Sequence, residues 1–333
     1  MIYPGSKPAA HFLASMDLRE SGFKGHQYPG AEGMWERLSA EANAFPGIAV
    51  FSHETLARAR KKRIKQAISA FNTDDVQVVL TTRDLARQLP AMWQEQVKNR
   101  NEQTYDDFLA EVFAAANAGD KAKRVKFWRP QDLVGLTERW VDIVGADKVT
   151  IVTVPRPGAE RQELWRRFAT ATELPDLRYD FDLEQENVSL GVVEAELLRR
   201  LNSRLPDDLD WPQYETRIKR RFAEHTLAPA EPAARLAVPE KWHAQIAEIS
   251  AGTIDYLRGS GCRVVGDLED LRSEPAAPEG PMPHEVTDGE VLDLALRILG
   301  TLAARPLPGR ASPATLSRRA RTMVQRAKRR LSS

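Results

Sequence analysis

An arginine at the end of a predicted strand is the residue of this sequence best placed to do chemistry. The apolar run 76–80 is typical of a buried strand, Thr81 and Thr82 close it, and Arg83 stands where a helix begins. In an open parallel sheet the carboxyl ends of the strands face the ligand crevice, and a guanidinium group grips phosphate or sulfate through two parallel hydrogen bonds. Arg83 is therefore a candidate anion-binding residue. The alternative is that it pairs with Asp84 or another acid and only holds the turn.

His53 and Glu54 form a second candidate group, because they follow directly on another apolar run, 47–52. Imidazole titrates near pH 7, so His53 is suited to take the proton of an attacking hydroxyl group, and the carboxylate of Glu54 is a second candidate base. The alternative is that one of the two residues caps the helix that we expect from Glu54 to Phe71.

The segment after the strand at 76–82 resembles a nucleotide-binding segment of a known family. Residues 83–95, RDLARQLPAMWQE, are similar to the segment with which sulfotransferases bind the 3'-phosphate of 3'-phosphoadenosine 5'-phosphosulfate (PAPS). The resemblance is to bacterial, actinobacterial members and runs from about Tyr3 to about Leu271. It implies an α/β fold of the P-loop NTPase type, a parallel sheet flanked by helices with strands near 48–52, 76–82 and 148–154.

The resemblance also implies roles for individual residues. Arg83 would hold the 3'-phosphate. The family has a serine eight residues later that shares this contact, and here that position is Ala91, which leaves the contact to Arg83 and Arg87. His53 or Glu54 would be the general base.

Ser189 is a further candidate, because the segment 187–189, Asn-Val-Ser, resembles one that contacts the nucleotide region in bacterial sulfotransferases. The alternative is that Ser189 caps the periodic helix expected to end near Arg204, with Asn187 hydrogen-bonded in the turn. No metal is implied, because arginine, lysine and helix amides neutralise the charge of the nucleotide.

The phosphosulfate-binding loop of the family has no counterpart in residues 1–333. That loop reads H-I-G-x-x-K-[ST]-G-T-T after a strand, and its lysine and amides hold the sulfuryl group and the bridging phosphate. The early Gly-Ser-Lys at 5–7 precedes Pro8 and follows no strand. Either the protein starts upstream of Met1 or the loop is lost. We expect the first, because a sheet without its central strand would expose two long apolar edges.

The composition is that of a soluble protein with one main domain. Of 333 residues, 42% are hydrophobic and 29% are charged. We expect a sulfotransferase-like domain over 1–271, a Pro-rich linker over 272–285, and a helical extension with a basic tail over 286–333. Cys262 is the single cysteine, which excludes an internal disulfide and favours the reducing cytoplasm. No run reaches the roughly 18 apolar residues that a membrane-spanning helix needs.

Positive charge is concentrated at the C-terminal end. Residues 305–333 contain eight Arg, one Lys and no acid, so the rest of the chain carries −8 against the +1 of the whole. An apolar stripe from Leu316 to Leu331 resembles that of a surface-bound helix, so weak association with the anionic inner face of a membrane is one expectation and a solvated tail is the other. The tail has no aromatic residue for base stacking, which argues against a nucleic-acid role.

These features lead to two functional hypotheses. The first is an enzyme that transfers a sulfuryl group from PAPS, its co-substrate, to a hydroxyl group of a carbohydrate, lipid or small metabolite, with the lysine loop supplied upstream. The second is a non-catalytic sulfotransferase-like scaffold protein that is truncated at its N-terminus and inactive.

Overall fold

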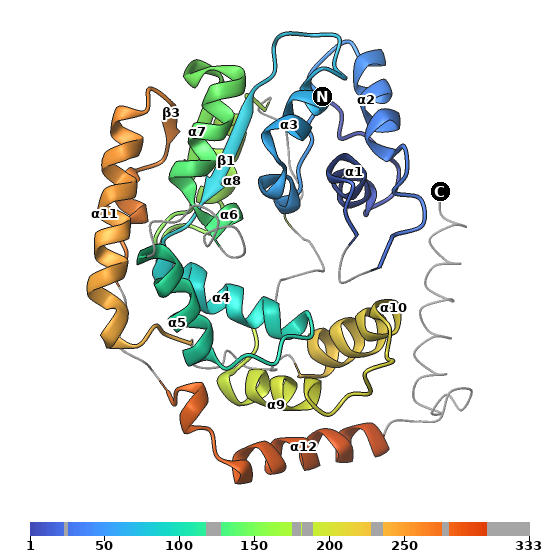
Figure 1. Cartoon of the computed structure of the whole chain (residues 1–333), viewed down its shortest axis with the longest axis vertical. Helices are drawn as coiled ribbons and strands as arrows, with labels where there is room; N and C mark the ends of the chain where they lie inside the picture. The colour runs from blue at the N-terminus through green and yellow to red at the C-terminus, as the bar shows by residue number, and fades with distance from the viewer. Residues whose placement is uncertain are drawn as a thin grey trace, which may run out of the picture. The chain divides into compact units, whose positions relative to one another are not determined.

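The computed structural model describes residues 1–22, 26–117, 128–174, 181, 189–227, 236–274 and 280–304. In these ranges the chain is an α/β protein, mostly helical, with one small sheet (Figure 1). The strands are β1 (Val78–Thr82), β2 (Val149–Thr153) and β3 (Arg263–Val265). The longer helices are α1 (Ala10–Arg19), α2 (Met34–Ala44), α3 (Lys61–Ile68), α4 (Leu85–Lys98), α5 (Tyr105–Asn117), α7 (Leu133–Val144), α8 (Glu163–Ala171), α9 (Val192–Asn202), the π-helix η4 (Glu215–Leu227), α11 (His243–Gly259) and α12 (Asp288–Ala303). The shorter helical turns are η1 (Glu54–Arg58), α6 (Trp128–Gln131), η3 (Ala146–Lys148), α10 (Trp211–Tyr214), η5 (Glu240–Trp242), η6 (Leu268–Leu271) and η7 (Pro283–Glu285).

The sheet is parallel throughout and has the order β1-β2-β3. Val78 pairs with Val149 and Thr82 pairs with Thr153, so β1 and β2 end at the same level. β2 is buried along its whole length, as expected of a strand covered on both faces. We call the end of the sheet that follows Thr82, Thr153 and Val265 the carboxyl edge.

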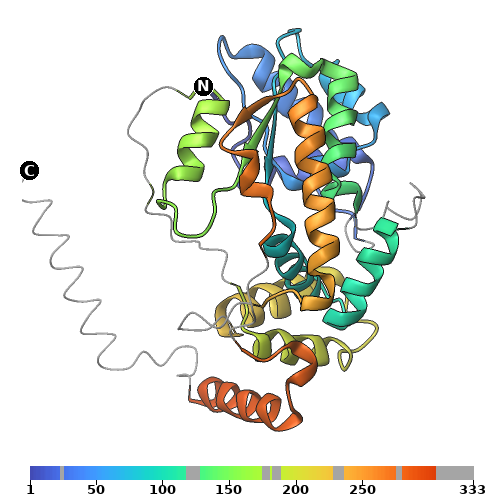
Figure 2. The same cartoon turned by 90° about the vertical axis from the view of Figure 1, so that its left-hand side faces the viewer.

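Helices cover both faces of the sheet. Figure 2 shows α8 on one side of it and α7 and α11 on the other. The core on the side of α7 and α11 includes Val78 and Ile151 from the strands, Ile254 and Leu257 from α11, and Leu271 from η6. This packing holds the strands in place, so the residues that follow each strand lie at the carboxyl edge.

The strands expected at 76–82 and 148–154 are confirmed as β1 and β2, with shorter bounds. The two strands pair directly with each other. The expectation that a sheet without the family's central strand would expose two apolar edges is therefore wrong for these two strands, because their facing edges are hydrogen-bonded to one another.

The prediction of a strand at 48–52 is wrong. Ala49 forms only an isolated parallel bridge with Ile2. The backbone N–H of Ile2 donates to the carbonyl of Ile48 at 2.8 Å, and that of Val50 donates to the carbonyl of Ile2 at 2.9 Å. The backbone groups of this run thus pair with the N-terminal segment and not with the sheet.

Residues 1–30, whose glycines and prolines are typical of loops, contain the helix α1. Ala10 and Ala14 recur at helical spacing and pack against Leu38 of α2. Gly5 and Pro8 stand just before the helix and mask this short periodic stretch in the sequence.

The helix expected from Glu54 to Phe71 is two shorter helices, η1 and α3, separated by extended backbone at Ala59 and Arg60. Arg139 of α7 donates from Nη1 to the carbonyl oxygens of Ala57 at 3.0 Å and Ala59 at 3.3 Å. A distant side chain therefore satisfies carbonyl groups that would otherwise accept bonds within one continuous helix.

The chain divides into two compact units, Met1–Val286 and Thr287–Ser333. In the second unit α12 begins with a capping box, in which the side chains of Thr287 and Glu290 each accept from the backbone N–H of the other. Leu292, Leu296 and Leu299 of α12 are 58%, 56% and 60% exposed. In the part of the chain that is described, no helix has the length and apolar character to cross a membrane.

Candidate functional site

Arg83 follows the last residue of β1 and so stands at the carboxyl edge. Its Nε and Nη2 donate to Oε1 of Gln88 at 3.2 and 2.9 Å. Gln88 in turn donates from Nε2 to Oε1 of Gln131 in α6 at 3.1 Å. The guanidinium group is half-buried, and no carboxylate of the described residues forms an ion pair with it.

A half-buried positive charge whose partner is a neutral amide lacks the counter-charge that usually accompanies it. Burial lowers the pKa of Arg83, nearby Arg87 lowers it further, and Asp84 offsets part of the change. The group nevertheless stays protonated, because the pKa of a free guanidinium group lies far above neutrality. Arg83 therefore offers a fixed positive charge, and the amide oxygen of Gln88 occupies a position that suits an oxygen of an anion.

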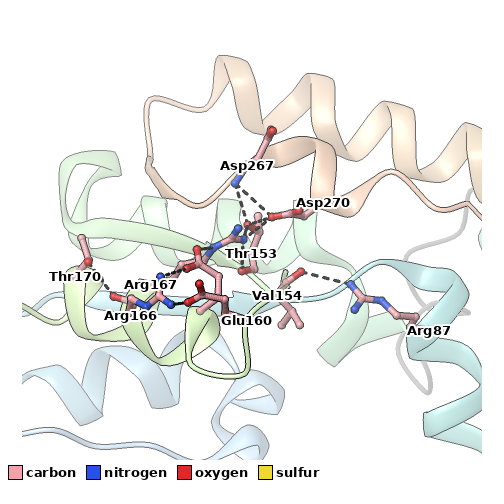
Figure 3. A network of polar contacts seen from close by, with 10 residues as sticks. Arg87, Thr153, Val154, Glu160, Arg166, Arg167, Thr170, Asp267 and Asp270 are labelled. Atoms are coloured by element: carbon pink, nitrogen blue, oxygen red, sulfur yellow. Dashed lines mark hydrogen bonds and ion pairs between the residues drawn. The ribbon is translucent and has the colours of Figure 1, made fainter. Parts of the chain in front are cut away.

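Asp84 does not pair with Arg83, so that alternative is wrong. One oxygen of its buried carboxylate accepts from the backbone N–H of Arg87 at 3.0 Å, and the other pairs with the Arg87 side chain. Arg87 also donates to the carbonyl oxygens of Pro155 at 2.9 Å and Val154 at 3.4 Å (Figure 3). Nη1 and Nη2 of Arg87 thus hold the first turn of α4 against the end of β2, while Nε binds the N-cap residue Asp84.

The carboxyl edge beside β2 and β3 is filled by a polar network that sequence reasoning missed (Figure 3). Arg167 of α8 donates from Nη1 to the carbonyl oxygen of Thr153 at 2.9 Å and to its Oγ1 at 2.7 Å, and pairs with Asp270. Its Nε donates to Glu163 at 2.9 Å. Arg167 thus has two carboxylate partners, whereas the partner of Arg83 at the end of β1 is, among the described residues, a neutral amide.

One ion pair of this network could be predicted from the spacing of its residues in the sequence. Glu163 and Arg167 have the i, i+4 spacing that pairs charges on a helix. The contact of Arg167 with Asp270 joins residues that are 103 positions apart, and the local sequence pattern does not predict it. Burial raises the pKa of Asp270, but the hydrogen bonds from Arg167 and Thr153 lower it, and the net direction is down.

His53 is the N-cap residue of η1, so the capping prediction is confirmed for it. Its Nδ1 lies 3.2 Å from the backbone nitrogen and 2.8 Å from Oγ1 of Thr55. The same nitrogen lies 3.6 Å from the carboxylate of Glu54, which is 86% exposed. His53 and Glu54 therefore form a close pair at the start of η1.

Capping and proton transfer need different tautomers of His53. To accept from the backbone N–H of Thr55, Nδ1 must be unprotonated, which places the proton on Nε2. In the other tautomer Nδ1 donates to Oγ1 of Thr55, and Nε2 presents the lone pair that a general base needs. Burial lowers the pKa of His53, Glu54 raises it in part and Arg19 lowers it, and the net direction is down, which favours the neutral ring.

Ser189 is exposed and precedes α9. The N-cap of α9 is Gly191, without a side-chain cap, so the alternative that Ser189 caps this helix is wrong. Asn187 lies outside the described residues. Gln94 of α4 donates to the carbonyl oxygen of Leu190 at 2.8 Å, which places the segment after Ser189 against the helix that follows Arg83.

The predicted site residues form two groups. Arg83 and Arg87 belong to the start of α4, and His53 and Glu54 belong to the start of η1. Within the described ranges no hydrogen bond or ion pair joins the two groups directly.

The two groups are connected through α6. Gln131 of α6 accepts from Gln88, the partner of Arg83. The carbonyl oxygen of Arg129, also in α6, accepts from Nη2 of Arg139 at 3.5 Å, and Arg139 binds the carbonyl of Ala57 in η1. α6 therefore lies between the arginine at the carboxyl edge and the helix that begins at His53.

Comparisons with known proteins add no assignment to this geometry. No protein-family model, no curated protein and no solved structure matches the chain. Where the structure describes residues, no three His, Cys, Asp or Glu side chains gather as metal ligands would.

Proposed function

We propose that the chain is a sulfotransferase-like protein that transfers a sulfuryl group from PAPS to a hydroxyl group of a carbohydrate, lipid or small metabolite. The observation that carries the proposal is Arg83, a half-buried cation at the carboxyl edge whose polar partner among the described residues is the neutral amide of Gln88. The resemblance of residues 83–95 to a 3'-phosphate-binding segment supports the same assignment.

The proposed reaction assigns a role to each group. The acceptor oxygen forms a new bond to sulfur while the bond from sulfur to the 5'-phosphate oxygen breaks, and the acceptor proton goes to a base. Arg83 holds the 3'-phosphate, and Ser189 supports the nucleotide. His53 takes the proton at Nε2 while its Nδ1 donates to Oγ1 of Thr55, and the carboxylate of Glu54 stabilises the imidazolium ion that results.

The test compares two nucleotides that differ only in the 3'-phosphate. By isothermal titration calorimetry, we expect 3'-phosphoadenosine 5'-phosphate to bind about 10- to 100-fold more tightly than adenosine 5'-phosphate, because charge-assisted hydrogen bonds contribute about 1.5–3 kcal/mol. Arg83→Ala should abolish this difference. The control Arg204→Ala, which removes an exposed arginine at the end of α9, should preserve it. Equal binding of the two nucleotides by the unmodified protein would contradict the proposal.

A second candidate function has its own observation. Leu292, Leu296 and Leu299 form an exposed row on α12, and the nine basic residues of 305–333 follow it in the sequence. We propose that this unit attaches the chain to an anionic lipid bilayer, with the leucines entering the interface and the basic residues meeting the head groups. A second copy of the chain is a poorer occupant, because it would bring two tails of the same charge together.

A further inference from the structure

Three arginines lie on α1, η1 and α6, and η1 contacts both of the other two helices. Arg19 is the last residue of α1, Arg58 is the last residue of η1, and Arg129 belongs to α6. We call these three residues the arginine triad. They come from segments that are far apart in the sequence, and neither the proposed nucleotide site nor the polar network at the carboxyl edge uses them.

The contact between α1 and η1 places Arg19 near Arg58. The hydroxyl groups of Ser15 and Thr55 are hydrogen-bonded to each other. Arg19 lies four residues after Ser15 on an α-helix, and Arg58 lies three residues after Thr55 on a 3₁₀ helix. Each arginine is thus one turn from the paired hydroxyl, on the face of its helix that makes the contact.

Hydrogen bonds of Arg139 place the backbone of Arg129 close to η1, the helix that ends at Arg58. Nη1 of Arg139 donates to the carbonyl oxygen of Ala57, the residue before Arg58, at 3.0 Å. Its Nη2 donates to the carbonyl oxygen of Arg129 at 3.5 Å. A single guanidinium group therefore binds the backbone of η1 and the backbone of α6 next to two members of the triad.

The charges of the triad repel one another. Burial lowers the pKa of Arg19, and the charges of Arg58 and Arg129 lower it further. Burial also lowers the pKa of Arg129, with Arg60 and Arg58 adding to the effect. Glu54 raises the pKa of Arg58 in part, but burial dominates and the net direction is down.

No acid neutralises these charges by direct contact. In the described part of the chain, the three side chains form no hydrogen bond and no ion pair. Glu20, the residue after Arg19, pairs with Arg63 instead. Glu54 extends into solvent beside His53. The fold thus gathers three cations and supplies no direct partner for them, which is the arrangement of an anion site.

We propose that the arginine triad binds an oxyanion of the phosphate or sulfate type, carried by a small molecule as a phosphate or sulfate ester. A tetrahedral oxyanion accepts hydrogen bonds from several guanidinium groups at once, and its negative charge removes their mutual repulsion. The site is separate from Arg83, which follows β1 and, in the described part of the chain, is linked to α6 by hydrogen bonds through Gln88 and Gln131.

The position of the triad also bears on the acceptor. His53 begins the helix that ends at Arg58, and the charge of Arg19 acts on the ring of His53. An anion bound by the triad would hold its parent molecule beside His53. The triad then selects an acceptor that carries an anionic group in addition to its hydroxyl group, and this assignment, unlike the anion site itself, rests on the proposed function.

The test uses inorganic pyrophosphate as the probe and the full-length Arg83→Ala protein as the parent, so that the other predicted anion site is removed. We expect calorimetry at constant ionic strength to show binding. Arg58→Ala should weaken it about tenfold, because one charge-assisted contact is lost, and Arg58→Ala with Arg129→Ala should abolish it. Arg204→Ala is the control for a change of one charge and should leave binding unaltered.

Two results would overturn the anion site: absence of pyrophosphate binding by the parent, or equal binding by the parent and the double variant. Arg58→Glu guards against misfolding as an explanation, because Arg58 is the last residue of η1 and its side chain forms no hydrogen bond or ion pair within the described residues that the fold would lose. It should abolish binding while circular dichroism and the melting temperature stay those of the parent.

A second titration separates two sources of the oxyanion. The protein with Arg83 intact is first saturated with 3'-phosphoadenosine 5'-phosphate and then titrated with pyrophosphate. Unchanged pyrophosphate affinity supports an anionic acceptor. Competition would assign the triad to the 5'-phosphate of the nucleotide and overturn the acceptor assignment. The direct titration with 3'-phosphoadenosine 5'-phosphate first establishes that the nucleotide binds, so failure of the nucleotide proposal is recognised before this second titration is interpreted.

Discussion

Arg83 and Arg167 lie at the same edge of the sheet and differ in their bonding partners. Arg167 is a structural cation held by carboxylates, whereas Arg83 is a candidate ligand-binding cation. Burial lowers the pKa of Arg167, but its bonds to Asp270 and Glu163 raise it, and the net direction is up. Burial and the neighbouring charge of Arg87 lower the pKa of Arg83, whose hydrogen-bond partner is a neutral amide. The opposite directions of the two pKa shifts reflect the carboxylate partners of Arg167 and the lack of a carboxylate partner for Arg83 among the described residues.

At the same scale, the titration of His53 is predicted to depend on Glu54. Burial disfavours the imidazolium ion, so the pKa of His53 should lie below the ordinary value of 6.5, and Glu54→Gln should lower it further by removing a charge that raises it. The unfolded chain then binds more protons, so this group lowers the stability of the fold as the pH falls below 6.5. Nuclear magnetic resonance of the ring nitrogens measures both the pKa and the tautomer.

Glu240→Gln is the control for this titration, because Glu240 is an exposed acid in η5, away from His53. It should leave the pKa of His53 unchanged. A pKa above 6.5 in the unmodified protein would show that Glu54 outweighs burial, contrary to the present interpretation.

At the scale of elements, the sequence indicated those features of the fold that depend on residues close together in the chain. The apolar runs of β1 and β2 and the capping box of α12 were recognisable because each depends on neighbouring residues. The run at 48–52 was misassigned because an apolar run indicates burial and does not identify the strand that it pairs with. The break between η1 and α3 was missed because its cause, Arg139, lies about 80 residues away.

The junction between β3 and η6 is predicted to require glycine at position 266. Gly266 has φ of +107°, and a Cβ there would lie 2.2 Å from Oγ1 of Thr153, inside the Arg167 network. We expect Gly266→Ala to lower the free energy of unfolding by about 2–4 kcal/mol, measured by urea denaturation. Gly252→Ala is the matched control, because Gly252 lies in α11 with open space around its Cβ position, and should raise stability by about 0.5–1 kcal/mol. Equal denaturation midpoints for the two variants would contradict this.

At the scale of the whole molecule, charge is divided between the two ends of the chain. The whole carries +1, and removal of residues 305–333 would leave −8. The unit that begins at Thr287 carries both the exposed leucines and the basic segment, whereas Arg83 and the triad belong to the unit that ends at Val286. The two proposed functions therefore separate along the chain and can be tested one at a time.

Deletion of residues 305–333 is predicted to abolish binding to lipid vesicles. The full chain should sediment with vesicles of phosphatidylglycerol and phosphatidylcholine, and less so as salt increases, because each basic residue near an anionic surface contributes about 1 kcal/mol. Leu296→Ser with Leu299→Ser should weaken binding and keep its salt dependence. Vesicles of phosphatidylcholine alone are the control. Equal sedimentation of the full and shortened chains would contradict membrane attachment by the tail.

The candidate site was predictable only in part, because the sequence reveals local patterns and not contacts between residues far apart in the chain. Arg83 could be located because a strand followed by a helix is a local pattern, and His53 because it follows an apolar run. The contact of Gln88 with Gln131 and the grouping of Arg19, Arg58 and Arg129 depend on how separate helices pack. Such contacts leave no trace in the spacing of residues along one sequence.

The crystal structure of the protein with 3'-phosphoadenosine 5'-phosphate tests the central claim most directly. We predict that oxygens of the 3'-phosphate lie within hydrogen-bonding distance of the Arg83 guanidinium group and that the side-chain amide of Gln88, which now accepts from it at 2.9 Å, has turned away. A nucleotide bound elsewhere, with the contact between Arg83 and Gln88 intact, would contradict the assignment of Arg83 as the anion-binding residue.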